Sequence, residues 1–407
     1  MRKRILLAVS CLIVVFSGCK SPPAKSQKAY DRPLPPGQLA LRKITNPAEI
    51  PDFSAACRDL AGLKTAVHRS INYLQKPSSR QFYPVGEITH DTALESLKSF
   101  AQMLDSGMTG AELNLAIRQK FDVYTSIGCD DQGTVLFTGY YTPIFDGSMQ
   151  RTERFCYPLY KPPDDLVKAP DGEILGRRMP DGQITAYPSR AVIEGARMLR
   201  GKELIWLSDP FEAYIAHVQG SAKLRLPNSK VTTVGYAASN GREYQSVAEA
   251  LVNDGKIPAD HISLASMIDY FKRHKDQVST YIRRNARYVF FQKQEDGSPR
   301  GCLNEPVTAY RTIATDKSIF PRGSLTFITT TLPHAVGGRA VSVPYSGFAL
   351  DQDAGGAIRA PGRSDVYMGV GDVAGELAGQ TYQEGRLYYL FLKQTTDGRN
   401  RYAQGNP

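Results

Sequence analysis

Apolar positions repeat with two different periods along the chain, and the change of period separates a helical region from a β-rich one. In DTALESLKSFAQML (91–104) the apolar residues recur every three or four positions, which predicts an amphipathic helix. Thr92 is the predicted N-cap, with Glu95 three residues later. GAELNLAIRQKF (110–121) repeats the pattern, so two helices are expected before the first strands.

From about residue 121 the pattern alternates instead. The segment 122–143 predicts a hairpin that turns at Asp131. In the middle of the chain we expect helices, one capped by Asp209 and one over 263–274. From about residue 287 short strands return, separated by Gly, Pro and Asp. This order predicts a mainly β fold with peripheral helices and a closed barrel, rather than a doubly wound parallel sheet.

The first residues are typical of an export signal. Arg2, Lys3 and Arg4 precede an apolar run, and FSGC ends at Cys19, which resembles a bacterial lipoprotein signal with lipidation of that cysteine. Ordinary signal cleavage and a plain membrane anchor stay open as alternatives. Lys20 after the cysteine favours the outer membrane, facing the periplasm, for a Gram-negative host.

Residues 19–40 are rich in Pro and Lys and predict a flexible tether behind the signal peptide of residues 1–18. The whole chain has a formal net charge of +10, and it stays basic after loss of the three signal charges. Outside the cytoplasm, lipid head groups and the carboxylates of cell-wall peptides are the available polyanions. Nucleic acid is therefore not an expected partner.

No metal or cofactor signature is present. The four cysteines beyond the signal (Cys57, Cys129, Cys156 and Cys302) lack metal-ligand spacing, and both disulfides and free thiols remain open for them. GVGDVAG (369–375) has glycine spacing like that of a nucleotide loop, but no neighbouring helix or βαβ pattern supports that function, so a turn is predicted.

One Asp- and Gly-rich stretch, DQDAGGAIRAPGRSDVYMG (351–369), lies between two apolar segments with strand character. A loop fixed at both ends by strands is a frequent place for catalytic residues. Elsewhere, FTGYYTP (137–143), AHVQGS (216–221) and YAASNGREY (236–244) combine aromatic, amide and hydroxyl side chains. Such side chains suit a sugar ring, which has both an apolar face and polar edges.

Five segments in order, FTGYYTP, DPFEAYIAHVQGS, NARYVFFQ, RTIATDKSIFPRGS and DAGGAI…SDVYMG, resemble the membrane-bound lytic murein transglycosylase A family. The resemblance implies a double-psi β-barrel domain, with an inserted second β-rich domain and the substrate groove between them. The implied boundaries are 41–143 with 292–396 for the discontinuous catalytic barrel, and 144–291 for the inserted substrate-binding domain.

Carried onto this chain, the resemblance implies Asp365 as the catalytic acid, supported by Asp353 and Asp316. The implied or candidate substrate-binding residues are Thr138, Gly139, Tyr140, Tyr141, Gln219, Gly220, Ser221, Asn240, Gly355 and Gly356. The implied reaction cleaves the β-1,4 bond between N-acetylmuramic acid and N-acetylglucosamine and forms 1,6-anhydromuramic acid, without a cofactor.

That reaction needs one essential carboxyl group, because the muramyl 6-hydroxyl is a nucleophile already tethered to the substrate. Asp365 must be protonated to act first as an acid. We expect burial beside Val366 and Tyr367, and the like charge of Asp353, to raise its pKa.

Two alternatives remain at this stage: a peptidoglycan hydrolase, which needs a second working carboxylate, and a murein-binding lipoprotein without activity. The expected partners are peptidoglycan glycan strands and, through the lipid anchor, the outer membrane. Other cell-wall enzymes are further candidate partners.

Overall fold

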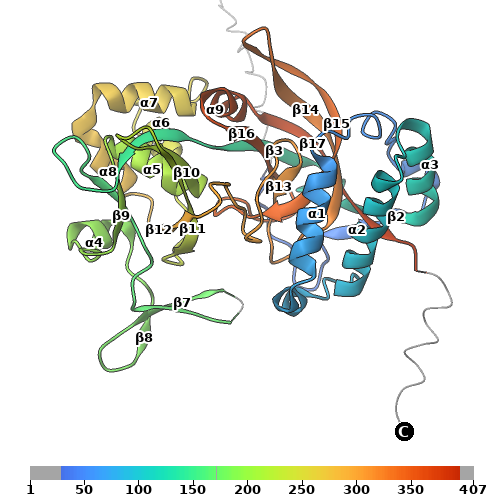
Figure 1. The fold of residues 1–407 in the computed structure, drawn as a ribbon, viewed down its shortest axis with the longest axis horizontal. Coiled ribbons are helices and arrows are strands. Elements are labelled where there is room, and N and C mark those ends of the chain that lie inside the picture. Colours follow the sequence, from blue (N-terminus) through green and yellow to red (C-terminus); the bar gives the residue numbers. More distant parts are fainter. Residues whose placement is uncertain (1–28, 171, 395–407) are drawn as a thin grey trace, which may run out of the picture.

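The computed structural model describes residues 29–170 and 172–394 (Figure 1). The expected signal peptide (1–18), the lipidation candidate Cys19 and the first part of the tether lie outside the described residues. Among the described residues, no helix combines the length and the apolar character needed to cross a membrane.

The centre of the molecule is a closed barrel of six strands. Each strand pairs with the next in the order β3, β17, β14, β15, β13, β16, and β16 pairs back with β3. Two of these pairings, β13–β15 and β3–β16, are parallel, and the others are antiparallel. The strands are β3 (Val135–Thr142), β13 (Thr312–Ala314), β14 (Leu325–Val336), β15 (Arg339–Asp353), β16 (Arg363–Val370) and β17 (Tyr382–Leu392).

The predicted hairpin over 122–143 is wrong in its pairing, although both strands exist. β2 (Phe121–Ser126) and β3 are each hydrogen-bonded to β17, and β1 (Leu41–Lys43) adds to the outer edge of β2. A strand from the far end of the chain thus takes the position that local pairing would have filled.

Helices α1 (Leu63–Leu74), α2 (His90–Asp105) and α3 (Gly110–Lys120) cover one side of the barrel (Figure 1). Their apolar faces join the barrel interior in one core that includes Leu97, Phe100 and Phe348. α2 begins three residues earlier than predicted, because Thr89 is the N-cap and accepts a hydrogen bond from the amide of Thr92.

The sequence predicted a turn at GVGDVAG (369–375), and this prediction is wrong, because the segment leads into a helix. α9 (Asp372–Gly379) follows β16 directly and packs on β3 and β16. Ala374, Leu377 and Ala378 bury its apolar side in the barrel core. This packing stabilises a glycine-containing helix that intrinsic propensity alone would disfavour.

The middle of the chain forms a second β unit. Strand β4 (Ile144–Ser148) follows β3 after a single residue, so one extended segment passes from the barrel into this unit. Its six-stranded sheet has the order β12, β11, β10, β4, β9, β5. The other strands are β5 (Tyr157–Tyr160), β9 (Glu203–Leu207), β10 (Ser221–Arg225), β11 (Val231–Ser239) and β12 (Val289–Gln294).

Helices cover this second sheet, and α5 and α7 have the predicted positions. Asp209 caps α5 by accepting hydrogen bonds from the amides of Phe211 and Glu212. The helices are α4 (Arg190–Gly195), α5 (Pro210–Gln219), α6 (Val247–Asn253), α7 (Leu264–Arg273) and α8 (Val278–Ile282), and the 3₁₀ turns of the chain are η1 (Pro47–Glu49), η2 (Pro77–Phe82) and η3 (Lys275–Gln277).

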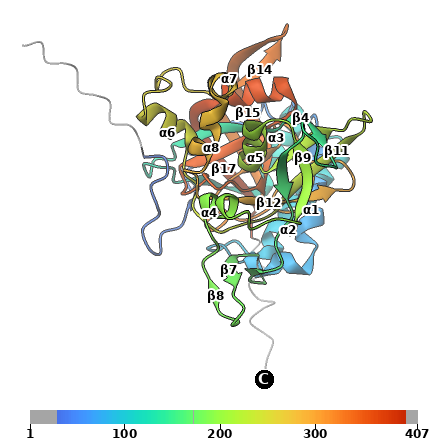
Figure 2. The same ribbon diagram turned by 90° about the vertical axis from the view of Figure 1, so that its left-hand side faces the viewer.

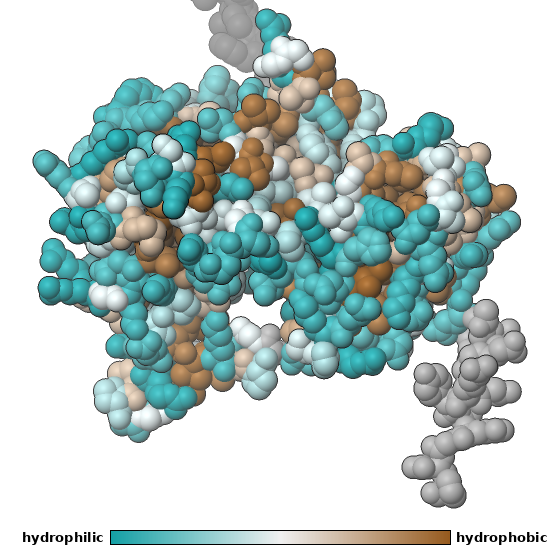
Figure 3. All heavy atoms as spheres, viewed as in Figure 1, coloured by the Kyte–Doolittle hydropathy of each residue, from teal (hydrophilic) through white to brown (hydrophobic). Residues whose placement is uncertain are grey.

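A small sheet of three strands projects from the second unit. It consists of β6 (Leu166–Lys168), β7 (Ile174–Arg178) and β8 (Ile184–Thr185). Both ribbon views show it extending beyond the body (Figures 1 and 2). The space-filling view is hollowed between this projection and the barrel, and its surface is largely hydrophilic there (Figure 3).

Residues 29–40, the last part of the expected tether, contact the barrel. The hydroxyl of Tyr30 donates to Glu384 of β17 at 2.7 Å, and Arg32 pairs with Asp131 at 2.7 Å. Ala40 is buried in the core. Within the described residues, the segment from Tyr30 onward therefore packs as part of the folded body.

Candidate active site

Two of the three candidate catalytic residues, Asp353 and Asp365, lie at one level of the barrel. Ala314 of β13 is paired with Asp353 of β15 on one side and with Asp365 of β16 on the other, and Asp365 is paired with Thr138 of β3. Directly paired residues project from the same face of a sheet. Neighbouring strands are about 4.8 Å apart, and β13 lies between the strands of the two aspartates. The backbones at Asp353 and Asp365 are therefore about 10 Å apart across the sheet.

Asp365 faces a cavity and is held by a neighbouring hydroxyl group. The side chain of Thr138 donates a short hydrogen bond to Asp365 Oδ1. Burial raises the pKa of Asp365, while the charge of Arg363 and the hydrogen bond from Thr138 lower it. The direction of the pKa shift and its cause, burial, agree with the expectation, whereas the like charge of Asp353 does not contribute to it.

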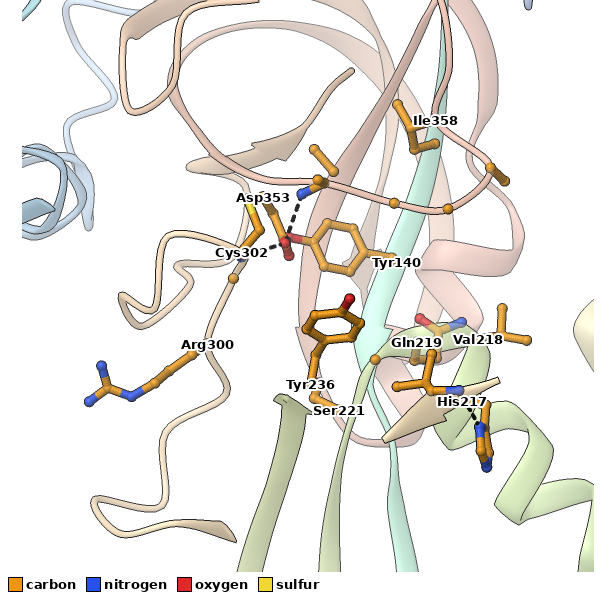
Figure 4. A pocket seen from close by; sticks show the side chains of 18 of the residues that line it. Tyr140, His217, Val218, Gln219, Ser221, Tyr236, Arg300, Cys302, Asp353 and Ile358 are labelled. Carbon is orange, nitrogen blue, oxygen red and sulfur yellow. Dashed lines mark hydrogen bonds between the residues drawn. The ribbon is translucent and has the colours of Figure 1, made fainter. Parts of the chain in front are cut away.

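Asp353 is fixed more firmly than Asp365. Its Oδ1 accepts from the backbone amides of Cys302 at 2.9 Å and Ala354 at 2.8 Å, and its Oδ2 accepts from the hydroxyl of Tyr140 at 2.8 Å (Figure 4). Burial again raises the pKa of Asp353, against these three hydrogen bonds. Both of its oxygens therefore have partners within the protein.

Asp316 does not line the same cavity as the other two aspartates. It lies in the turn after β13, where Oδ1 accepts from the amide and hydroxyl of Ser318, and Oδ2 accepts from the amide of Ala360 at 3.0 Å. Ala360 has a φ of 65°, a conformation that few non-glycine residues adopt. Asp316 thus holds the end of the loop that joins Asp353 to Asp365.

The cavity in front of Asp365 has a volume of about 780 Å³ and lies between the barrel and the second β unit. Its lining includes seven of the expected substrate-binding or catalytic positions besides Asp365 and Asp353: Gly139, Tyr140, Gln219, Gly220, Ser221, Gly355 and Gly356. Tyr236 of β11, an exposed aromatic residue, also lines this cavity (Figure 4). It belongs to the segment YAASNGREY, whose side chains suit a sugar, but it is not among the expected substrate-binding residues. In a strand with both buried and exposed residues, the sequence does not distinguish Tyr236 from any other exposed position.

Gln219 and Ser221 also connect the two β units. The side-chain oxygen of Gln219 accepts from the amide of Tyr141, and the hydroxyl of Ser221 lies 3.2 Å from that of Thr142. These contacts fix the end of α5 against the continuous segment β3–β4. The two walls of the cavity are therefore held at a defined separation.

Two of the expected substrate-binding residues face away from the cavity. Tyr141 is buried, and its ring lies against α9, where a Cβ on Gly375 would meet it at 2.8 Å. Asn240 donates to the carbonyls of Pro188 and Ala286 and accepts from the amide of Tyr288. The structure thus gives Asn240 loop-holding hydrogen bonds.

A buried ion pair lies beneath the site and was not predicted. Asp351 is fully buried, accepts from Thr315 and from Tyr389 at 2.8 Å, and pairs with Lys317. Asp351 is paired with Ile313 and Asp353 with the next residue of β13, Ala314, because the pairing has a bulge here. Consecutive residues of a strand project from opposite faces, so Asp351 and Asp353 lie on opposite faces of the sheet. Cys57, Cys156 and Cys302 form no disulfide within the described residues, and these residues contain no metal-ligating cluster of three or more His, Cys, Asp or Glu.

Comparisons with known proteins agree on both parts of the chain. Residues 136–292 match the MltA specific insert domain, and residues 311–391 match the 3D domain. Membrane-bound lytic murein transglycosylase A of Escherichia coli K12 is 27% identical over 273 residues, which are 66% of this chain and 69% of that protein. The Vibrio cholerae enzyme of the same name is 26% identical over 275 residues, 66% of this chain and 68% of that protein.

Solved structures repeat the fold. The membrane-bound lytic murein transglycosylase of Agrobacterium tumefaciens has a TM-score of 0.72 at 25% identity, over 89% of this chain and all of that one. Escherichia coli MltA with bound chitohexaose has a TM-score of 0.63 at 23% identity, over 91% of this chain and 97% of that one.

The barrel, the inserted β unit and the aspartate-lined groove between them define an enzyme of the lytic transglycosylase class, a lyase acting on peptidoglycan. Within that class, the chain carries the MltA specific insert domain and the 3D domain, and it is similar in sequence to membrane-bound lytic murein transglycosylase A.

Proposed function

We propose that the enzyme cleaves the β-1,4 bond between N-acetylmuramic acid and N-acetylglucosamine and leaves a 1,6-anhydromuramyl end, with Asp365 as the single acid and base. The observation that carries the proposal is the contrast between the two aspartates of the cavity. Asp365 receives one side-chain hydrogen bond, whereas both oxygens of Asp353 are occupied by protein donors.

The raised pKa of Asp365 suits the first step, in which the protonated carboxyl gives its proton to the glycosidic oxygen. The carboxylate then accepts the proton of the muramyl 6-hydroxyl as that oxygen attacks the anomeric carbon. The hydroxyl is part of the same sugar, so no water and no second base are needed.

The remaining groups bind and orient the glycan strand. Tyr140 and Tyr236 offer aromatic faces to sugar rings, and Gly220 leaves room for the glycan strand between the two walls. The chitohexaose bound to the Escherichia coli structure supports a groove of this kind for a β-1,4-linked amino sugar. We propose residues 144–291 as the inserted substrate-binding domain, and 41–143 with 292–396 as the catalytic barrel.

The names of the relatives support an envelope location. We propose lipid attachment at Cys19 to the outer membrane, with the enzyme facing the periplasm.

A pair of substitutions tests the single-carboxyl mechanism. Asp365→Asn should lower turnover of purified murein by ~10²–10⁴-fold, because the amide group is too weak an acid to protonate the glycosidic oxygen. Asp353→Asn should cost much less, since the asparagine oxygen can still accept from the amides of Cys302 and Ala354. Equal loss in two correctly folded variants would favour a hydrolase with two working carboxylates.

A further inference from the structure

A second cavity of about 870 Å³ lies on the other side of the loop that carries Asp353. Both cavities are lined by residues of that loop, namely Ala354, Gly355, Ile358 and Arg359. The far wall of the second cavity is formed by the N-terminal segment around Leu39 and by residues 81–86. The two spaces therefore meet at the catalytic loop.

The second cavity is predominantly basic. Arg287, Arg322, Arg359 and Lys317 line it, against Glu173 and Asp316. The carboxylate of Asp316 is already bonded to Ser318 and Ala360, and Lys317 is paired with Asp351. The guanidinium of Arg322 stacks on Phe82, 3.5 Å from the ring centre.

Arg287 and Arg359 differ from these, because no ion pair joins either of them to a carboxylate within 29–170 and 172–394. Arg287 donates a long hydrogen bond, 3.5 Å, to the carbonyl of Arg242, and it also interacts with the side chain of Tyr236. Burial lowers the pKa of Arg287, and the positive charge of Arg359 acts in the same direction, whereas Tyr236 and Glu243 raise it. Both residues line both cavities.

We propose that the second cavity binds the stem peptide of the muramyl residue, with Arg287 and Arg359 contacting its free carboxylates. This inference rests on the proposed function, which puts the glycan in the first cavity. The substrate is branched at the muramyl sugar, and a branch point at the catalytic loop would send the glycan into one cavity and the peptide into the other. A carboxylate between two guanidinium groups gains charge-assisted hydrogen bonds and relieves their repulsion.

The apolar residues of the far wall fit the same ligand. Leu34, Leu39 and Val85 line the second cavity beside the arginines. A short peptide with methyl side chains and terminal carboxylates has the matching combination of apolar and anionic groups. The enzyme would thus distinguish peptide-bearing glycan from bare glycan by charge.

Binding to the inactive Asp365→Asn protein tests this directly. The probes are soluble murein strands with free stem carboxylates and the same strands after carbodiimide amidation of those groups. The free-acid strands should bind about fivefold or more tightly than the amidated ones. Adding Arg359→Gln should remove most of this difference, and Arg287→Gln should act in the same direction.

Arg339→Gln is the matched control, because this exposed arginine at the start of β15 lines neither cavity. It should leave the ratio of the two dissociation constants unchanged. Arg359 is exposed, so its variant should fold even if loss of the half-buried Arg287 disturbs the structure.

Equal affinity of the parent protein for both kinds of strand would overturn the proposal, as would an equal weakening of both by Arg359→Gln. The proposed reaction is judged separately, by whether the wild-type enzyme forms anhydromuramyl ends. If no anhydromuramyl ends form, the proposed reaction is wrong, but the comparison of free-acid and amidated strands still tests peptide binding in the second cavity.

Discussion

Asp365 combines a catalytic requirement with a cost to stability. Burial raises its folded pKa above the unfolded value, so this carboxyl stabilises the fold fully only below its unfolded pKa. The contribution is lost as the pH rises through the folded pKa. Asp365→Asn should therefore be inactive and, at neutral pH, more stable than the wild type.

Urea unfolding of both proteins across about pH 3 to pH 7 checks this prediction. The free energy of unfolding of the variant, relative to the wild type, should rise with pH. A constant difference across that range would mean that Asp365 has an unshifted pKa.

Thr138 lowers the pKa of Asp365, against the effect of burial. Its hydroxyl donates to Asp365, which favours the charged form and lowers the pKa. Thr138→Val should therefore raise the pKa, so that the alkaline limb of kcat/KM moves to higher pH. Thr138→Ser keeps the hydroxyl and should keep the limb in place; a shift in both variants, or in neither, would contradict this role.

The sequence correctly predicted that Asp365, Asp353, Tyr140 and the VQGS segment meet at one groove, because their motifs are local. It could not identify Tyr236 or Arg287 as cavity residues. A single aromatic residue in a strand, or a single basic residue in the loop before β12, has no distinctive pattern. Only the approach of the second β unit to the barrel places these two residues at the groove.

At the scale of elements, β3 depends on close contact with α9. A Cβ on Gly139 would lie 2.7 Å from the Cα of Ala378, a backbone atom that cannot rotate away. Gly139→Ala should push α9 outward and destabilise the protein by about 1–3 kcal/mol. It should also lower activity, since Thr138 and Tyr140 flank this residue.

Gly379→Ala at the end of α9 is the control, because a Cβ there meets nothing within 4 Å. Thermal melts and murein turnover of both variants check the prediction. Equal melting temperatures would show that the contact between α9 and β3 is more adaptable than its geometry indicates.

Element prediction failed where distant segments decide the structure. The period of the strands was right, but the hairpin was wrong because β17, which follows every other barrel strand in sequence, pairs with both β2 and β3. α9 was missed because its glycines weaken the helical signal, while burial of Leu377 against the barrel stabilises the helix.

At the scale of the whole molecule, the N-terminal segment sets where the enzyme can be separated from its proposed anchor. Tyr30 and Arg32 bind the barrel, and Ala40 is buried. A protein that starts at Ala29 should fold, stay in solution and digest murein. One that starts at Leu41 should melt at a lower temperature, because it lacks these contacts; identical melts would contradict this.

In the full-length protein, Cys19→Ala should release the enzyme from the membrane fraction or block its processing. The acyl chains of a lipoprotein cysteine contribute ~0.8 kcal/mol for each buried methylene. Cell fractionation checks the prediction. Retention of the variant on the membrane after normal processing would mean that lipid at Cys19 is not the anchor.

The chemistry of the new glycan end tests the central claim most directly. Mass spectrometry of murein digested by the wild-type enzyme should find muramyl ends that lack one molecule of water, as the internal attack of the 6-hydroxyl requires. In ¹⁸O-labelled water these ends should carry no label. Reducing ends that contain the heavy oxygen would show that water is the nucleophile, and would contradict the single-carboxyl mechanism at Asp365.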